Sequence, residues 1–211
     1  VTNISINIVG IGTETYPSGI TLLEILSSAK GVSKDTLICK VDKVLTDLSA
    51  SLTSDATVQF LDGKSKDGHN VLLHSTAHLM AQAAKRLYPK TKVTIGPYLE
   101  NRFYYDFDVE TPFTDEDLLK IEHEMLKISE ENLDIVHHVK SRKDALNFFK
   151  EIGEDYKVEI INDLDESEVL KVYTQGDFTD LCRGPHVPST GLIQHFKLLS
   201  SSPNFNDNAF P

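Results

Sequence analysis

The chain has no tryptophan, only two methionines and only two cysteines among its 211 residues. Cys39 and Cys182 are far apart in the sequence, and one distant pair makes a poor disulfide framework. A reducing, cytoplasmic setting is therefore expected. No apolar run approaches the roughly 20 residues of a membrane-spanning helix, and no secretory leader opens the chain, so neither a membrane nor export is expected.

Net positive charge is also lacking, because 21 Lys and Arg stand against 32 Asp and Glu, for a net charge of −11. This balance argues against a general nucleic-acid binder. The charge is uneven, however. Residues 63–105 contain two acidic residues and seven basic ones: Lys64, Lys66, Lys85, Arg86, Lys90, Lys92 and Arg102. This basic stretch is either a solvated helix face or a patch that faces phosphates.

The first 62 residues show the pattern of a small α+β roll. Residues 2–9 alternate apolar and polar side chains, as a half-buried strand does. Thr21 and Glu24 have the spacing of a capping box, which predicts a helix that runs to about Lys30. Short strands are expected over residues 37–41, 44–45 and 57–61. The polar, glycine-flanked residues 62–68 are expected to form a linker.

The remainder of the chain is predicted to form a larger α+β unit. A helical period begins at Asn70 and ends at Pro89. Thr114 and Ser141 are expected to open two further helices, because each is followed three residues later by an aspartate. Strands are expected over residues 93–95, 103–107, 133–139, 157–161, 169–174 and 178–181.

Two short segments carry most of the chemical information. His74 and His78 are four residues apart, so a helix places them on one face, one turn apart. About a hundred residues later, Cys182 and His186 flank Gly184-Pro185, which forbids a regular helix and predicts a rigid turn. We expect these four side chains to converge on one site.

Three imidazoles and one thiol have two interpretations that composition does not separate. They form the ligand set of a tetrahedral zinc site, in which an acceptor would orient each imidazole. Without a metal, the same groups can hold a water molecule against an ester carbonyl. Four protein ligands would close the coordination shell, so a catalytic zinc would require water to displace one of them.

Several segments resemble a known family. In chain order they read HSTAHLMAQA, IGP, RFYYDFD, YKV, DLCRGPHVPSTG and HFKLL. Their order and spacing are similar to those in the N-terminal half of bacterial-type threonyl-tRNA synthetases. The resemblance implies an α+β fold, with a small β-grasp (TGS) domain at residues 1–62. A larger α+β editing (second additional) domain of the threonyl/alanyl-tRNA synthetase type would follow at residues 63–211.

This resemblance implies proofreading. The editing domain of the family hydrolyses the ester in seryl-tRNA(Thr), in which serine is wrongly attached, and spares threonyl-tRNA(Thr). The implied partner is therefore the 3′ end of tRNA(Thr) carrying serine, together with the aminoacylation and anticodon-binding domains of the parent family. No cofactor is expected in this chain, and zinc is the alternative.

The resemblance also assigns roles to individual residues. The implied catalytic residues are His74, Lys157, His78, Cys182 and His186, of which His74 and Lys157 would position the attacking water. The implied substrate-binding residues are Asp180, Tyr105 and Arg183, with Asp180 as the partner of the substrate ammonium. No metal is expected; if zinc is present, its ligands would be His74, His78, Cys182 and His186. Without the resemblance, Lys157 would be interpreted as a surface cation and Tyr105 as a core ring.

Two other functions stay open on the sequence. One is a free-standing, zinc-dependent editing protein of the alanyl type, and the other is a non-catalytic tRNA-binding module. The chain departs from the family at residues 200–206, which stand where a segment leading to the aminoacylation domain is usual. The tail favours a natural editing-only protein, whereas the initial Val1 favours an excised piece. Neither a natural editing-only protein nor an excised piece of this kind is expected to activate threonine with ATP on its own.

Overall fold

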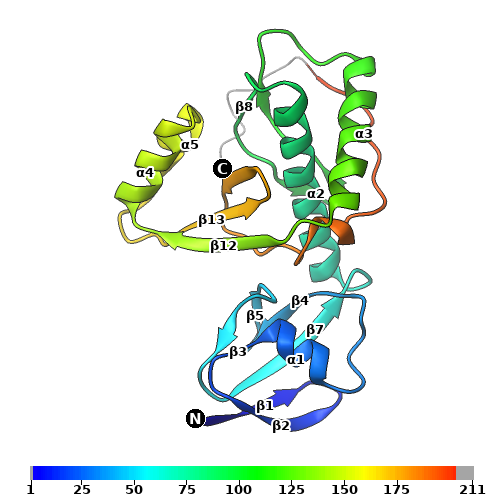
Figure 1. Ribbon diagram of the computed structural model, residues 1–211, viewed down its shortest axis with the longest axis vertical. Helices are drawn as coiled ribbons and strands as arrows, with labels where there is room; N and C mark the ends of the chain where they lie inside the picture. The colour runs from blue at the N-terminus through cyan, green and yellow to red at the C-terminus, as the bar shows by residue number, and fades with distance from the viewer. Residues whose placement is uncertain (1, 203–211) are drawn as a thin grey trace.

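The computed structural model describes residues 2–202, and Figure 1 shows two parts connected through the long helix α2. Residues 203–206 of the unusual tail lie outside the described residues. The first part contains one helix and seven strands: β1 (Asn3–Ile8), β2 (Gly12–Pro17), β3 (Ile20–Thr21), α1 (Leu22–Ser28), β4 (Thr36–Val41), β5 (Val44–Thr46), β6 (Ser51–Leu52) and β7 (Ala56–Asp62).

The first part is built on a five-stranded mixed sheet in the order β2-β1-β7-β4-β5. Strands β1 and β7 are parallel, whereas the other neighbours are antiparallel. The alternating isoleucines of β1 are buried and pack with Leu22 and Ile25 of α1. The predicted capping box is present, since Thr21 Oγ1 accepts from the Glu24 N–H at 3.2 Å and Glu24 Oε2 accepts from the Thr21 N–H at 2.8 Å. Helix α1 ends at Ser28, two residues earlier than predicted.

The second part combines helices with small antiparallel sheets. Its elements are α2 (Lys66–Leu87), β8 (Lys92–Val93), β9 (Tyr98–Leu99), β10 (Arg102–Phe103), β11 (Phe107–Asp108), α3 (Asp115–Glu131), β12 (Ile135–Lys140), α4 (Arg142–Glu151), α5 (Asp155–Asp163), β13 (Leu170–Gln175), β14 (Phe178–Leu181) and the 3₁₀ turn η1 (Thr190–Leu192). Strands β12, β13 and β14 form one sheet, and α3 packs beside α2 (Figure 1). The predicted α+β class is confirmed. Among residues 2–202, no helix has the length and apolar composition that a bilayer crossing requires.

The linker predicted over residues 62–68 is wrong in its second half, because α2 begins at Lys66 rather than near Asn70. Ser65 is the N-cap, and its Oγ accepts from the Gly68 N–H at 3.1 Å. The Asp67 carboxylate in the first turn also complements the positive end of the helix dipole. These local interactions let the helix begin within residues 62–68, although the polar, glycine-flanked composition of that segment predicted a linker.

The strand predicted over residues 157–161 is also wrong, because this segment lies in α5. Its β-branched residues suggested a strand, but the helical spacing of four places Lys157 and Ile161 on one buried face. Ile161 packs with Phe149 of α4 and Leu170 of β13. Tertiary packing therefore overrides the local β propensity. The strands expected over 93–95 and 103–107 are reduced to two-residue ladders.

The two parts share buried surface. Leu37 and Ile38 of β4 belong to the same hydrophobic cluster as Leu79 of α2 and Met125 of α3. The first part has its own cluster between α1 and the sheet. The domain boundary between residues 62 and 63 remains a prediction, and the shared cluster means that any two such domains are packed together rather than merely tethered.

Candidate functional site

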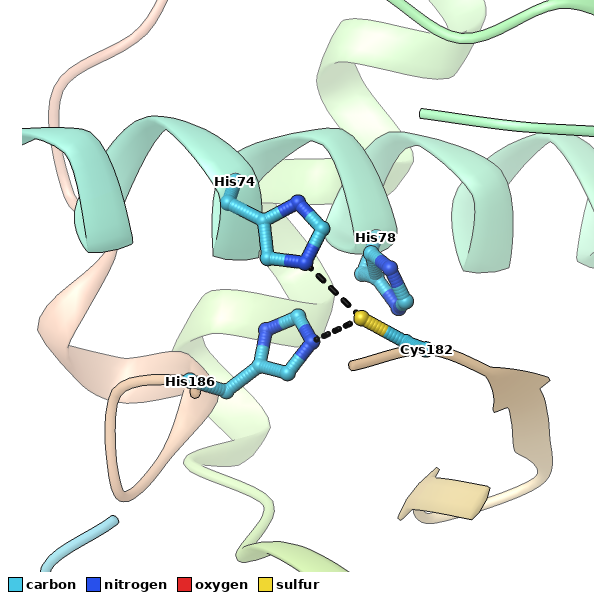
Figure 2. A group of neighbouring side chains, drawn as sticks. All are labelled: His74, His78, Cys182 and His186. Carbon is cyan, nitrogen blue, oxygen red and sulfur yellow. Dashed lines mark hydrogen bonds between the residues drawn. The ribbon is translucent and has the colours of Figure 1, made fainter. Parts of the chain in front are cut away.

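Helix α2 supplies the first two candidate ligands. Figure 2 shows His74 and His78 projecting from the same side of the helix, as their spacing predicts. Their ring centroids are 4.9 Å apart. His78 is only 3% exposed, and His74 is partly exposed at the edge of the cluster.

A sharp turn after β14 supplies the other two. Gly184 has φ +67, a conformation that favours glycine, and a Cβ there would lie 1.9 Å from the Tyr173 hydroxyl oxygen. The turn thus packs against Tyr173 and reverses the chain between Cys182 and His186. The Gly184 N–H also donates to Cys182 Sγ at 3.1 Å, which holds the thiol inside the turn.

The four side chains meet at one point, as predicted. One ligand atom from each of His74, His78, Cys182 and His186 lies within 4.8 Å of those of the others. Figure 2 shows Cys182 Sγ between two rings, 2.9 Å from His74 Nε2 and 3.4 Å from His186 Nε2. The convergence is a fact of the fold, whereas the role of each residue remains a prediction.

Contacts on the outer side of the rings decide which nitrogens face the cluster. His74 Nδ1 lies 3.3 Å from the carbonyl oxygen of Gly96, which can only accept, so Nδ1 carries the proton. His74 Nε2 therefore directs a lone pair at the Cys182 thiol. His186 Nδ1 lies 3.0 Å from Ser75 Oγ, so its Nε2 also faces inward.

Burial keeps these four groups uncharged near neutral pH when no metal is bound. Desolvation lowers the pKa of His74, and it lowers the pKa of His78 and of His186 well below the usual range. The neighbouring imidazoles push the pKa of His78 and His186 in the same direction. Desolvation also raises the pKa of the Cys182 thiol to about 12. The cluster therefore presents neutral imidazoles and a protonated thiol.

A buried ion pair lies beside the cluster. Lys157, 1% exposed, contacts Asp180 Oδ1 through Nζ at 2.6 Å and donates to the Thr94 carbonyl at 2.5 Å. The Tyr105 hydroxyl donates to Asp180 Oδ2 at 2.6 Å, and desolvation together with this carboxylate raises the pKa of Tyr105 well above its usual range. His78 Nε2 lies 3.7 Å from the same carboxylate oxygen. Lys157 is therefore not a surface cation. The resemblance pointed to Lys157, Asp180 and Tyr105, which the residue types alone did not single out.

Arg183 stands apart from the other predicted site residues. Its side chain is 81% exposed and pairs with Glu168 Oε1 at 2.7 Å, so the structure does not bring it into the cluster. Two contacts of His186 were not predicted from the sequence. Ser75 reaches its ring, and Asp47 Oδ1 accepts from its backbone N–H at 3.0 Å. No sequence signal marks Asp47, which lies 139 positions earlier.

The donor set also fits a zinc ion. The residues that would hold it are His74, His78, Cys182 and His186, and the Gly96 carbonyl and Ser75 hydroxyl would orient two of the imidazoles from outside. Such an ion would activate a water for hydrolysis only if that water displaced one of the four ligands. The Lys157 ammonium lies close enough to lower the pKa of His78. The same positive charge would repel a zinc ion held by the cluster.

The basic stretch at residues 63–105 is partly neutralised by acidic residues from later in the chain. Four of its seven cations have carboxylate partners there: Lys85 with Glu154 (2.5 Å), Arg86 with Glu131 (2.6 Å) and Asp177 (3.0 Å), Lys90 with Glu110 (3.6 Å), and Lys92 with Asp155 (2.7 Å). Within residues 2–202, Lys64, Lys66 and Arg102 have no such partner. The stretch is therefore divided, because four of its cations form intramolecular ion pairs and three are left to face solvent or phosphates.

Comparison with known proteins places the cluster in a family context. A family profile described as "Threonyl and Alanyl tRNA synthetase second additional domain" matches residues 170–204, which include β13, β14 and the Cys182–His186 turn. Over 186 residues, the chain is 52% identical to the threonine–tRNA ligase of Symbiobacterium thermophilum. It is 50% identical over 184 residues to that of Pelobacter propionicus and 51% identical over 175 residues to that of Fusobacterium nucleatum.

These alignments cover most of this chain but a minority of each relative. They include 88%, 87% and 81% of the chain, and only 29%, 29% and 28% of the three ligases, in the same order. The chain thus spans less than a third of the length of the curated relatives that it matches.

Proposed function

Because this chain belongs with the threonine–tRNA ligases, as a homologue of their N-terminal part that carries an editing-type second additional domain, we propose that it proofreads tRNA(Thr). It hydrolyses the ester of seryl-tRNA(Thr) and spares threonyl-tRNA(Thr). The observation that supports this most is the cluster of neutral imidazoles and a thiol beside the Lys157–Asp180 pair. That arrangement suits a reaction that must orient a water and stabilise a developing oxyanion.

The physical need for such an activity follows from the size of serine. Serine lacks one methyl group of threonine, and a pocket discriminates by only about 1–3 kcal/mol per methylene. A synthetic site that accepts threonine therefore admits some serine. A second, smaller site can accept the seryl ester and reject the threonyl ester through a clash with its extra methyl group.

In the proposed mechanism, His74 holds the attacking water. Its Nδ1 proton is committed to the Gly96 carbonyl, so Nε2 accepts the proton of the attacking water once that water takes the place of the thiol contact. When the ester C–O bond breaks, the same Nε2 returns the proton to the departing ribose oxygen. The resemblance implies that Lys157 positions the water; we propose instead that its ammonium stabilises the negative charge on the former carbonyl oxygen of the ester. Its longest contact, 3.4 Å to the Tyr105 hydroxyl, is the one exchanged for the substrate oxygen. Asp180 holds Lys157 in place and shares its carboxylate with the substrate ammonium.

A deacylation assay tests the proposal. We expect the protein to hydrolyse seryl-tRNA(Thr) at least about tenfold faster than threonyl-tRNA(Thr), which is the discrimination that one methyl group supplies. Both substrates are incubated with the protein and with buffer, and the ester that remains is counted over time. A seryl ester that decays at the buffer rate would refute the proposal and favour a non-catalytic tRNA-binding module.

A zinc-dependent editor is the second candidate, and the donor set of the cluster favours it. We propose that the reaction needs no metal, so removal of metal by a chelator is expected to leave the rate of seryl-tRNA(Thr) hydrolysis unchanged. Metal analysis of protein purified without chelator is the companion measurement. Stoichiometric zinc that is lost together with activity would make the second candidate the function.

We also propose that the chain works on a tRNA held partly by other domains. With a net charge of −11 and a basic stretch partly engaged in ion pairs, the chain alone should bind tRNA weakly and in a salt-sensitive manner. The aminoacylation and anticodon-binding domains of the parent family would supply the remaining contacts. The cytoplasm, where tRNA is charged, is the proposed compartment.

A further inference from the structure

Asp47 directly follows β5, in a loop of the first part of the chain. The residue is only 7% exposed, although it is a carboxylate on a loop. Buried carboxylates require hydrogen-bond donors, and here the donors come from the second part of the chain.

Both carboxylate oxygens of Asp47 are used. Oδ1 accepts from the backbone N–H of His186 at 3.0 Å, and Oδ2 accepts from the Tyr173 hydroxyl at 2.8 Å. His137 Nδ1 also lies 3.4 Å from Oδ2, without the geometry of a hydrogen bond. The two hydrogen bonds thus connect the first part of the chain to His186, at the end of the Cys182–His186 turn, and to Tyr173 in β13.

These contacts determine where the His186 ring lies. The Tyr173 ring packs edge-on against the His186 ring, with centroids 4.5 Å apart, and the Tyr173 hydroxyl fills the space that a side chain at position 184 would need. Asp47 therefore fixes the main chain of His186 and the aromatic surface against its ring. The ring also contacts α2, since its Nδ1 lies 3.0 Å from Ser75 Oγ.

We propose that Asp47 is a positioning residue of the hydrolytic site, so that the site is complete only when the N-terminal part of the chain is docked. This inference rests on the hydrolytic function proposed above. Asp47 acts through His186 and Tyr173 and does not contact the substrate. A shift of about 1 Å in a positioned group can lower a rate about a hundredfold, so the loss of these two hydrogen bonds should be visible in kinetics.

The test compares three variants of the whole chain in the seryl-tRNA(Thr) assay. Asp47→Ala removes both acceptors, and kcat is expected to fall about 10- to 100-fold with KM within a few-fold of wild type. Asp47→Asn keeps an acceptor for the His186 N–H and a polar partner for Tyr173, so it should recover most of kcat. Lys40→Ala is the matched control, because it breaks an ion pair between the same two parts of the chain, Lys40 to Asp67, without touching the cluster.

A second readout follows the contact itself. In NMR spectra of protein labelled at histidine, the His186 backbone amide proton is expected to move upfield in Asp47→Ala and to stay near its wild-type position in Lys40→Ala. A wild-type kcat in Asp47→Ala, or an equal loss of kcat in Lys40→Ala, would overturn the inference. Wild-type protein that hydrolyses no seryl-tRNA(Thr) would refute the proposed function, and this inference with it, whereas active wild type with an unaffected Asp47→Ala variant would refute the inference alone.

Discussion

Replacement of Lys157 with methionine is expected to remove most of the hydrolysis of seryl-tRNA(Thr), with a loss of about 10²–10³-fold in kcat because an oxyanion-stabilising donor disappears. The same variant should also lose about 3–5 kcal/mol of unfolding free energy, since Asp180 is left buried without its cation. Kinetics and denaturant unfolding measure the two effects separately.

A second substitution separates catalysis from stability. In the double variant Lys157→Met/Asp180→Asn, the buried charge is removed from both partners. The amide can still accept from the Leu181 N–H and meet the Tyr105 hydroxyl, so most of the unfolding free energy should return. Hydrolysis should not return, because the oxyanion donor and the carboxylate partner of the substrate ammonium are both missing. A double variant that regains activity with stability would mean that Lys157 acts only as a structural cation.

Lys85 provides the matched control for Lys157. It lies on α2 outside the cluster and forms an ion pair with Glu154, which is 2% exposed. Lys85→Met should therefore lower the unfolding free energy, again because a buried carboxylate loses its partner. Its kcat on seryl-tRNA(Thr) should stay near that of wild type. If Lys85→Met lost activity as severely as Lys157→Met, the loss would reflect destabilisation and not chemistry.

Local patterns were sufficient to predict much of the fold. The capping box at Thr21 and the alternation in β1 act within a few residues, so the sequence alone reveals them. The segment around Lys157 could not be predicted in this way, because its β-branched residues favour a strand while packing against Phe149 and Leu170 requires a helix. The residues adjacent to Lys157 in the sequence do not indicate that packing.

The candidate site divides in the same manner. The spacing of His74 and His78 predicts that they share one helix face, and Gly184-Pro185 predicts a turn between Cys182 and His186. The convergence of the four side chains could therefore be predicted from two short segments. The burial of Lys157 was indicated only by the resemblance, and the contacts of Asp47 by nothing in the sequence. Both depend on contacts between residues far apart in the chain, which spacing cannot encode.

Replacement of His74 with alanine is expected to lower kcat by about 10²–10⁴-fold, the usual contribution of a general base, with little change in stability. The ring is partly exposed and its outer contact is one 3.3 Å bond to the Gly96 carbonyl, so its removal leaves little unsatisfied. Deacylation kinetics and thermal unfolding provide the measurements. His69→Ala is the control, because it removes an imidazole from the same helix, in its first turn and outside the cluster.

The contrast with Cys182 decides which chemistry His74 serves. Without a metal, His74 Nε2 takes the proton of water and the thiol is a neighbour 2.9 Å away, so Cys182→Ser, whose hydroxyl can still donate there, should cost far less than His74→Ala. With zinc, both residues would be ligands, and serine is a poor substitute for a thiolate, so the two variants should lose activity and metal together. Comparable losses in both variants would therefore contradict the metal-free mechanism even before any metal is measured.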